Sequence, residues 1–249
     1  MRRPLRPLFF SEGALGTGVL GHTAVVAALR SGLRGVTEVE PRFCGPPPRR
    51  RGSRLAARPV PLLFRYGLDF QPTRWHLVQS LHARRAIDDA LAAGPADVLY
   101  VNSHSSALLL GRAMGSVPTF LSVDVTFWDW ERMGIWQPVH PWTRPTLAAS
   151  LSLERRALTS ARAVVAWTTW AAEAARRAAP GARVIALHPG VDLERFRPVD
   201  RRPRERARVL FVGGRFAEKG GLDLVVAMGP RRGDGGGGAG GDPHTPPPP

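Results

Sequence analysis

Short, wholly apolar strand patterns alternate with helical patterns along this chain, and the alternation leaves few folds open. Strands are predicted at 6–10, 97–102, 117–125, 163–167 and 183–187, and helices at 22–33, 73–93, 105–114, 146–158 and 169–178. Strands without a polar face that alternate with helices are typical of a parallel sheet covered on both sides. With 249 residues, 43% of them apolar, the chain can bury one large α/β core and carry a further fragment.

Two segments of the first 100 residues carry more specific expectations. The stretch 41–61 is rich in proline and arginine, so we expect an exposed loop there. The segment 73–93 is expected to form an amphipathic helix whose apolar residues share one half of the helical wheel. Those residues are Leu77, Val78, Leu81, Ile87 and Leu91.

The composition changes near residue 200. Residues 200–208 are charged and contain proline, as connections between domains do, and an apolar strand pattern follows at 208–212. After Gly229 the sequence is dominated by glycine and proline, so we expect a disordered tail. The predicted domains are therefore 1–199, a short start of a second domain at 200–229, and a tail at 230–249, where a genuine tail and a frameshift remain alternatives.

Charge and cysteine content exclude several classes of function. The formal charge is +15, which favours anionic partners, yet Lys219 is the only lysine among 35 basic residues. That imbalance indicates a coding bias, so solvated surface arginines are favoured over a dedicated polyanion site. Cys44 is the only cysteine, so no internal disulfide and no Cys/His zinc spacing exists, and no metal site is predicted.

The apolar runs are too short to span a bilayer and the start lacks a secretory pattern, so we expect a cytoplasmic protein.

The segment 209–228, VLFVGGRFAEKGGLDLVVAM, has the residues of a phosphate site. Glycines after a strand let a diphosphate approach the backbone, and the next helix offers unpaired N–H groups at its N-terminus. The candidate donor-phosphate ligands are Gly213, Gly214, Arg215, Lys219 and Gly220. The alternative is an ordinary turn whose charges are solvated.

The run RVIALHPGVDLERFRP at 183–198, followed by the glycines and the Lys-Gly pair, resembles the hinge and donor motifs of a glycosyltransferase family. This is the large retaining, nucleotide-sugar-dependent family with the GT-B fold, of the group 1 or family 4 kind. Further similarities lie at 97–102 with His104, at 122–126 (SVDVT) and at 163–177. The resemblance implies a Rossmann-like acceptor-side domain ending in a hinge at 183–199, and then a second Rossmann-like domain that begins near residue 200.

The family transfers sugar from a nucleotide donor with retention, usually without a metal, so a nucleotide sugar is the implied co-substrate and no other cofactor is expected. The loop that carries Gly16, Gly18, Gly21 and His22 would border the cleft, or be a flexible turn. Asp124 ends a predicted strand, where many relatives carry a histidine that contacts the reacting sugar. Its carboxylate would accept a hydrogen bond from a sugar or acceptor hydroxyl, or cap a turn. His104 is a second catalytic candidate.

Two departures from the family pattern matter. Arg215 lies four residues before Lys219, one fewer than usual, so Lys219 is the safer phosphate ligand. The glutamate pair that holds the donor sugar has no counterpart, so we expect a truncated second domain and impaired turnover. A non-catalytic remnant is therefore one alternative, and a polyanion or nucleic-acid-binding module is a less favoured one. The expected partners are the donor and a glycan or lipid-linked acceptor, with the basic loop 49–58 touching the anionic inner face of a membrane.

Overall fold

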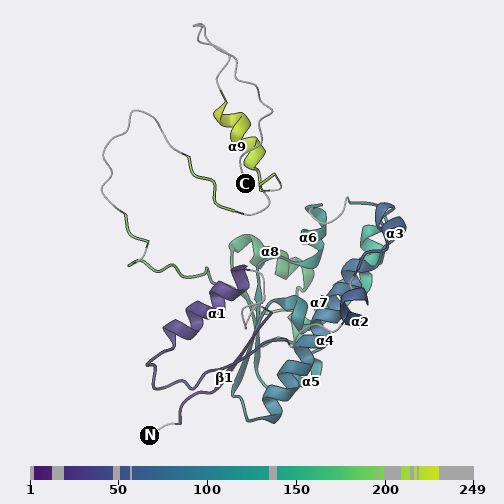
Figure 1. Cartoon of the computed structure of the whole chain (residues 1–249). Helices are drawn as coiled ribbons and strands as arrows, with labels where there is room; N and C mark the ends of the chain where they lie inside the picture. The colour runs from purple at the N-terminus through teal and green to yellow at the C-terminus, as the bar shows by residue number, and fades with distance from the viewer. Residues whose placement is uncertain are drawn as a thin grey trace. The chain divides into compact units, whose positions relative to one another are not determined.

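The computed structural model describes residues 3–12, 20–46, 51–56, 58–134, 139–194, 196–198, 209–213, 216–217 and 219–229. The chain divides into two compact units, Met1–Arg197 and Pro198–Pro249, and each is described here by itself. The tail expected at 230–249 lies outside the described residues. Figure 1 labels the α-helices of both units and strand β1.

A six-stranded parallel sheet forms the centre of the first unit and confirms the predicted α/β class. Its order is β2-β1-β3-β4-β5-β6. The strands are β1 (Pro7–Ser11), β2 (Arg42–Cys44), β3 (Val98–Asn102), β4 (Thr119–Val123), β5 (Ala163–Ala166) and β6 (Val184–Ala186). The chain moves from β1 outward to β2, then crosses back to β3 on the other side of β1. This reversal of strand order is typical of Rossmann-like, doubly wound sheets.

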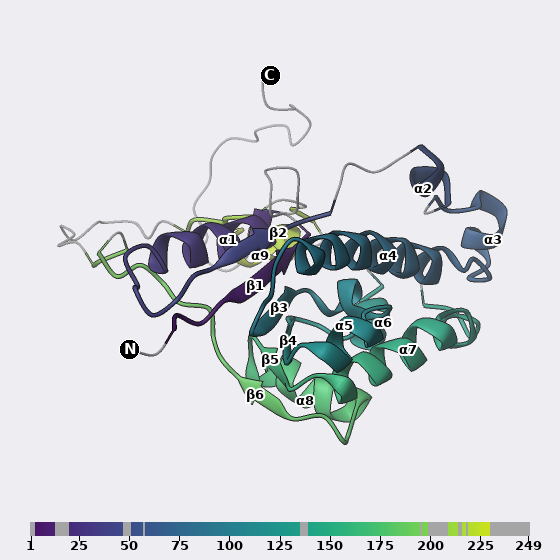
Figure 2. The ribbon, with the colours of Figure 1, turned by 90° about the horizontal axis from the view of Figure 1, so that it is seen from below.

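The first unit contains helices of very different length. They are α1 (Leu20–Gly32), α2 (Arg51–Ala56), α3 (Pro61–Arg65), α4 (Gln71–Ala92), the 3₁₀ helix η1 (His104–Ala107), α5 (Gly111–Ser116), α6 (Phe127–Arg132), α7 (Thr143–Ser160) and α8 (Thr169–Ala178). Figure 2 shows α1 on one side of the sheet, and α4, α5 and α7 on the other. Right-handed crossovers produce this arrangement, because β1 to β2 runs in one direction and β3 to β6 in the opposite one.

The apolar core lies between the sheet and the α4, α5 and α7 layer. Alternate strand residues point into it, as a period of two requires. Leu99, Leu121 and Val164 are fully buried there, together with Ile87 of α4 and Leu158 of α7. On the α1 side, Phe9 stacks on Phe43 with ring centroids 5.1 Å apart, and Arg30 of α1 lies 4.7 Å above the Phe43 ring.

Three local predictions are wrong. The stretch 41–61 is not simply a loop, because β2 pairs with β1 at the sheet edge and α2 lies within it. An edge strand needs only three residues and tolerates neighbouring prolines. The predicted helix 105–114 is instead η1 and α5, separated by Leu108 to Leu110. In the second unit, residues 209–213 are not a strand, while the helix predicted after them is present as α9 (Gly221–Met228).

The buried side of α4 also differs from the prediction, because most of its residues are polar. Leu81 is 38% exposed, whereas Thr73, His76 and Ser80 are buried. Hydrogen bonds offset their burial. The Thr73 hydroxyl donates to the Thr146 carbonyl oxygen at 2.8 Å, and the Ser80 hydroxyl donates to the Ser106 carbonyl oxygen at 3.1 Å.

His76 is the most strongly perturbed of these buried side chains. Its ring stacks on Phe127 with centroids 3.7 Å apart, and its Nδ1 lies 3.1 Å from the Ser150 hydroxyl. Burial, helped by the nearby His104, lowers the pKa of His76 to about 3. The imidazole is therefore neutral in the folded protein, whereas in the unfolded chain it protonates near its ordinary value of 6.5.

This difference predicts a loss of stability in acid. The unfolded chain binds one more proton than the folded one between pH 6.5 and pH 3, so the free energy of unfolding should fall by about 1.4 kcal/mol per pH unit in that window. Above pH 6.5 the contribution is fully present. Urea unfolding of the wild type and of His76→Gln, measured at several pH values, should show a shallower slope for the variant. Exposed His188→Gln serves as the control, and equal slopes for all three proteins would contradict the prediction.

Candidate functional site

The carboxyl ends of β1, β3 and β4 lie next to one another, since these strands are neighbours in the sheet. The strand order reverses between the β1–β2 pair and β3, and ligands of open α/β sheets bind outside the carboxyl ends at such a reversal. Glu12 follows β1 directly, Ser103 and His104 follow β3, and Asp124 follows β4. This row of polar residues is the candidate site.

The turn after β3 is strained. Ser103 has φ of 128°, which is the one positive φ outside glycine among the described residues. Backbone of this kind costs on the order of 1–3 kcal/mol and persists only where the surroundings hold it. Here the Ser103 and Ser105 hydroxyls lie 2.6 Å apart. Such outliers concentrate at functional sites, which supports this edge as the candidate site.

Glu12 connects the end of β1 to this turn. Its Oε1 accepts hydrogen bonds from the hydroxyl groups of Ser105 at 2.8 Å and Ser106 at 2.6 Å. Both serines are buried, so the carboxylate satisfies two donors that have left water. Glu12 therefore fixes the start of the β1 to α1 connection against η1.

His104 lies beneath the surface rather than on it. The residue is 4% exposed, and its ring lies 4.6 Å from the Phe127 ring. Its Nε2 is 2.9 Å from Glu154 Oε1 but is not aligned for a hydrogen bond, and its Nδ1 has no partner within the described part of the chain. The same Glu154 oxygen accepts the Phe127 backbone N–H at 2.9 Å. The imidazole therefore has a carboxylate beside Nε2, and neither ring nitrogen forms a hydrogen bond within the described residues.

Asp124 is exposed at the rim of the site. It follows the last residue of β4 and precedes Thr126, which caps α6 by accepting the Asp129 backbone N–H. No intramolecular hydrogen bond engages the Asp124 carboxylate within the described residues, so it can accept one from a substrate hydroxyl. Of the two predicted catalytic residues, Asp124 is open to a ligand and His104 is covered.

The last residues of the predicted glycine loop are helical. Gly16 and Gly18 lie outside the described residues. Helix α1 begins at Leu20, so Gly21 and His22 belong to its first turn instead of the loop. They still follow the carboxyl end of β1, where a helix N-terminus can face an anion.

The second unit brings three of the predicted phosphate ligands together, while Gly214 and Arg215 lie outside the described residues. Gly220 has φ of 79° and forms the N-cap of α9, a conformation that suits glycine. The Lys219 stem passes over Gly213, where an added Cβ would lie 3.3 Å from Lys219 Cδ. Gly213, Lys219 and Gly220 therefore sit together at the start of a helix.

Sequence reasoning missed Glu12 and Glu154. Glu12 follows a predicted strand at the sheet edge, which is a signal that could have found it. Glu154 lies in a predicted helix among arginines and looks like a solvated surface charge, so only the fold reveals its burial. Among the described residues, no cluster of three or more His, Cys, Asp or Glu side chains could hold a metal ion. Nor does any helix in those ranges have the length and apolar character to cross a membrane.

The profile of the family described as Glycosyltransferase Family 4 matches residues 20–195 of the chain. A comparison with curated proteins gives no match. Among solved structures, a UDP-glucosyltransferase from Polygonum tinctorium that glucosylates indoxyl is similar, with 13% identity and a TM-score of 0.45 over 82% of this chain and 56% of that one. A UGT transferase from Siraitia grosvenorii in complex with UDP has 15% identity and a TM-score of 0.42 over 76% of this chain and 52% of that one. The chain spans about half the length of these two proteins.

The geometry at Glu12 predicts a measurable loss of stability in Glu12→Ala. The variant leaves two buried serine hydroxyls without their acceptor, which should lower the free energy of unfolding by about 2 kcal/mol. Urea unfolding at pH 7 measures it. Glu173→Ala on the exposed side of α8 is the control and should stay within about 0.5 kcal/mol of wild type. A loss for Glu12→Ala no larger than this control would show that the bridge from β1 to η1 is not maintained in solution.

Proposed function

Because this chain belongs to glycosyltransferase family 4, we propose that it takes part in transfer of a sugar from a nucleotide-sugar donor to a glycan or lipid-linked acceptor. The observation that carries the proposal is the row of polar residues at the carboxyl ends of β1, β3 and β4, where a doubly wound sheet binds ligands. The first unit would receive the acceptor there. The second unit would receive the donor through its glycine and lysine segment.

The acceptor side and the donor side of the reaction each have a candidate residue. The exposed Asp124 carboxylate accepts a hydrogen bond from the acceptor or sugar hydroxyl and assists its deprotonation. Lys219, with the backbone N–H groups at the N-terminus of α9, stabilises the charge that develops on the departing diphosphate. Arg215 adds a second positive charge in the same segment. The anomeric configuration is retained, and no metal takes part.

His104 and Glu154 have a supporting part in this proposal. Glu154 is buried, and its carboxylate lies 2.9 Å from His104 Nε2, so its negative charge faces that side of the ring. His104 Nδ1 has no hydrogen-bond partner within the described residues, so it is the ring atom that can form a hydrogen bond with another group. In this proposal Asp124 contacts the acceptor directly. His104 lies beneath the acceptor and makes that region polar.

Nucleoside diphosphate release tests this proposal. The full chain is incubated with UDP-, GDP- and ADP-sugars and with glycan and lipid-linked acceptors. Release above the rate of spontaneous hydrolysis is expected with one donor, at the impaired turnover that the lack of the glutamate pair implies. Asp124→Asn keeps the shape of the side chain but removes its basicity, so the rate should fall by roughly 10²–10⁴-fold. Asp89→Asn, on the exposed side of α4, is the matched control. A folded protein that releases no nucleotide from any donor would refute sugar transfer by this chain and favour the non-catalytic remnant. Equal rates for the two variants would remove Asp124 from the mechanism.

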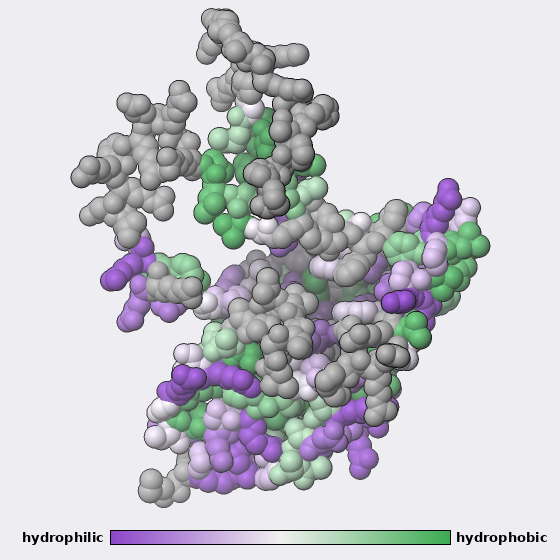
Figure 3. All heavy atoms as spheres, in the orientation of Figure 1, coloured by the Kyte–Doolittle hydropathy of each residue, from purple (hydrophilic) through white to green (hydrophobic). Residues whose placement is uncertain are grey.

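An anionic membrane surface is a further partner in this proposal. Residues 41–68 contain seven arginines and no acidic residue. Large apolar side chains in the same stretch are exposed, among them Leu55 at 63%, Leu62 at 66% and Tyr66 at 56%. Figure 3 shows apolar side chains beside hydrophilic ones over α2 and α3. Apolar and basic residues on one surface favour the interface of an anionic bilayer.

A half-buried ion pair fixes the backbone around α3. Asp69 is fully buried, pairs with Arg74 at 2.9 Å and accepts the Val60 backbone N–H at 2.7 Å. Arg74 in turn donates to the carbonyl oxygens of Ala56 and Arg58. The backbone on both sides of α3 is thereby fixed to α4, and the apolar side chains of α3 remain in solvent instead of folding back.

Vesicle sedimentation tests the membrane contact. Binding is expected to vesicles that contain phosphatidylglycerol, to be weak on pure phosphatidylcholine, and to decrease with salt because Coulomb attraction is screened. Leu62→Ser combined with Tyr66→Ser removes two apolar groups worth about 1.5–3 kcal/mol each when buried, so binding should fall more than tenfold. Leu193→Ser, which is exposed elsewhere on the chain, is the control. Undiminished binding of the double variant would rule out this surface.

A further inference from the structure

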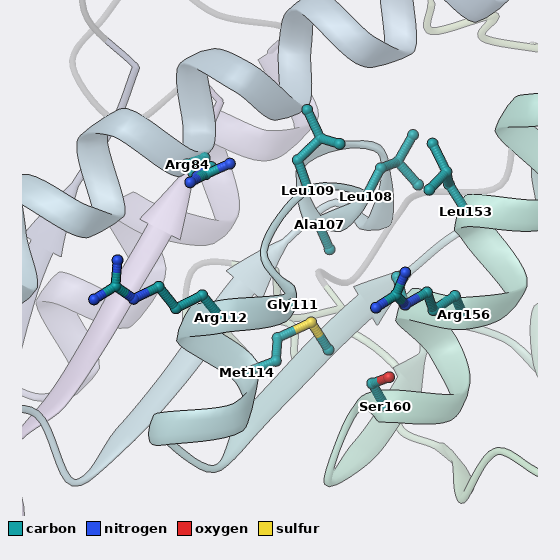
Figure 4. A pocket seen from close by; sticks show the side chains of 11 residues that line it. Arg84, Ala107, Leu108, Leu109, Gly111, Arg112, Met114, Leu153, Arg156 and Ser160 are labelled. Carbon is teal, nitrogen blue, oxygen red and sulfur yellow. The ribbon is translucent and has the colours of Figure 1, made fainter.

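A hollow lies between α4, the η1 to α5 segment and α7, away from the candidate site. Its volume is about 280 Å³. Figure 4 shows its lining, in which Leu108, Leu109 and Leu153 lie to one side and Met114 to the other. The walls are therefore mainly aliphatic, and an apolar group placed there leaves water.

Three arginines from three different elements surround this hollow. Arg84 comes from α4, Arg112 from α5 and Arg156 from α7, and no acidic residue contributes to the lining. In Figure 4 Arg156 lies across the hollow from Arg84 and Arg112. Arg112 and Arg156 have no ion pair in the described part of the chain. Arg84 has one with Asp88 at 3.5 Å, but both side chains are about half exposed, so this pair contributes little.

The hollow continues into a second one of about 390 Å³, and Met114 and Ser160 line both. The second hollow is bordered by Val117 and Thr119 at the amino end of β4 and by Arg162. Its lining also has no acidic residue. The combined groove therefore lies toward the amino end of β4, whereas Glu12, His104 and Asp124 lie at the carboxyl ends of their strands. It is separate from the proposed sugar-transfer site.

Like charges around an apolar surface create a field that favours an anion. Arg112, Arg156 and Arg162 have no ion pair within the described residues, and Arg84 has only the half-exposed pair with Asp88. These guanidinium groups raise the positive potential, and the low-polarity walls reduce its screening. Guanidinium groups bind phosphate and carboxylate through paired N–H donors, which suits a head group at the rim. The aliphatic walls suit a chain attached to that head group.

We propose that this groove binds an amphipathic anion, in which a phosphate or carboxylate head contacts Arg112 and Arg156 and an aliphatic chain lies along Leu109, Met114 and Leu153. Neither the anionic head nor the aliphatic chain accounts for the lining by itself. A polyanion without an apolar part would not bury the leucines, and a neutral apolar ligand would not pair with the arginines. The inference is independent of the proposed function, since none of these residues takes part in it.

Calorimetric titration of the full chain with n-octyl phosphate tests the proposal. We expect saturable binding of one molecule, at least tenfold weaker binding of inorganic phosphate, and no binding of octyltrimethylammonium, which has the same chain and the opposite charge. Arg112→Gln combined with Arg156→Gln should weaken octyl phosphate binding at least tenfold. Arg155→Gln, an exposed neighbour on α7 that does not line the groove, should leave it unchanged.

Two results would overturn the inference. Equal affinity for inorganic phosphate and octyl phosphate would mean that the aliphatic walls play no part. Equal binding of octyl phosphate by the double variant and by Arg155→Gln would mean that the ligand binds elsewhere. The exposed α3 surface is then the next site to test, and weaker octyl phosphate binding by Leu62→Ser would identify it. The natural ligand can be a lipid in a bilayer or a soluble amphiphile, and vesicles that contain phosphatidic acid distinguish these two sources. The vesicles displace octyl phosphate if the groove binds a lipid head group at a bilayer, and they do not if the natural ligand is soluble.

Discussion

The buried carboxylate of Glu154 is the interaction on which the arrangement of the first unit depends. A carboxylate taken out of water costs several kcal/mol unless donors or positive charge compensate it, so its partners must stay in place. It accepts the Phe127 backbone N–H at the start of α6 and lies 2.9 Å from His104 at the start of η1. Helix α7 is thereby tied to the segments that follow β3 and β4. These contacts hold in place the segments that carry His104 and follow Asp124 at the candidate site.

The polar layer around Glu154 replaces what would otherwise be an apolar helix contact. Thr73 and Ser150 bond to each other between α4 and α7, and His76 stacks on the same Phe127 whose backbone N–H Glu154 accepts. Buried polar contacts of this kind fix one relative position of two helices, because a shift by one residue leaves several donors without acceptors. Helix α4 is then positioned by hydrogen bonds at its N-terminal half and by the apolar core at Ile87.

Most of the fold could be predicted from the sequence, since strand and helix periodicity is a local property. The helix at 169–178 and the strands around Leu99 and Leu121 were found within two residues of their ends. The buried side of α4 could not be predicted, because polar burial depends on partners from η1 and α7 that are distant in sequence. The strand β2 was missed for a similar reason, as only pairing with β1 makes Arg42 to Cys44 extended. At the site, position after a strand identified Asp124 and His104, whereas the burial of His104 is a property of the fold.

The arginines show why net charge alone says little about function. Arg3 and Arg6 share Asp97, and Arg42 donates to the carbonyl oxygens of Ala90 and Gly94, so these charges hold the chain together. Others, such as Arg85 or Arg155, are solvated. The arginines that point to a ligand are those that the fold gathers without a counter-ion beside apolar side chains. In the composition all 35 basic residues are equivalent. In the fold, an arginine that belongs to a binding surface differs from a solvated one by the aliphatic side chains that lie beside it.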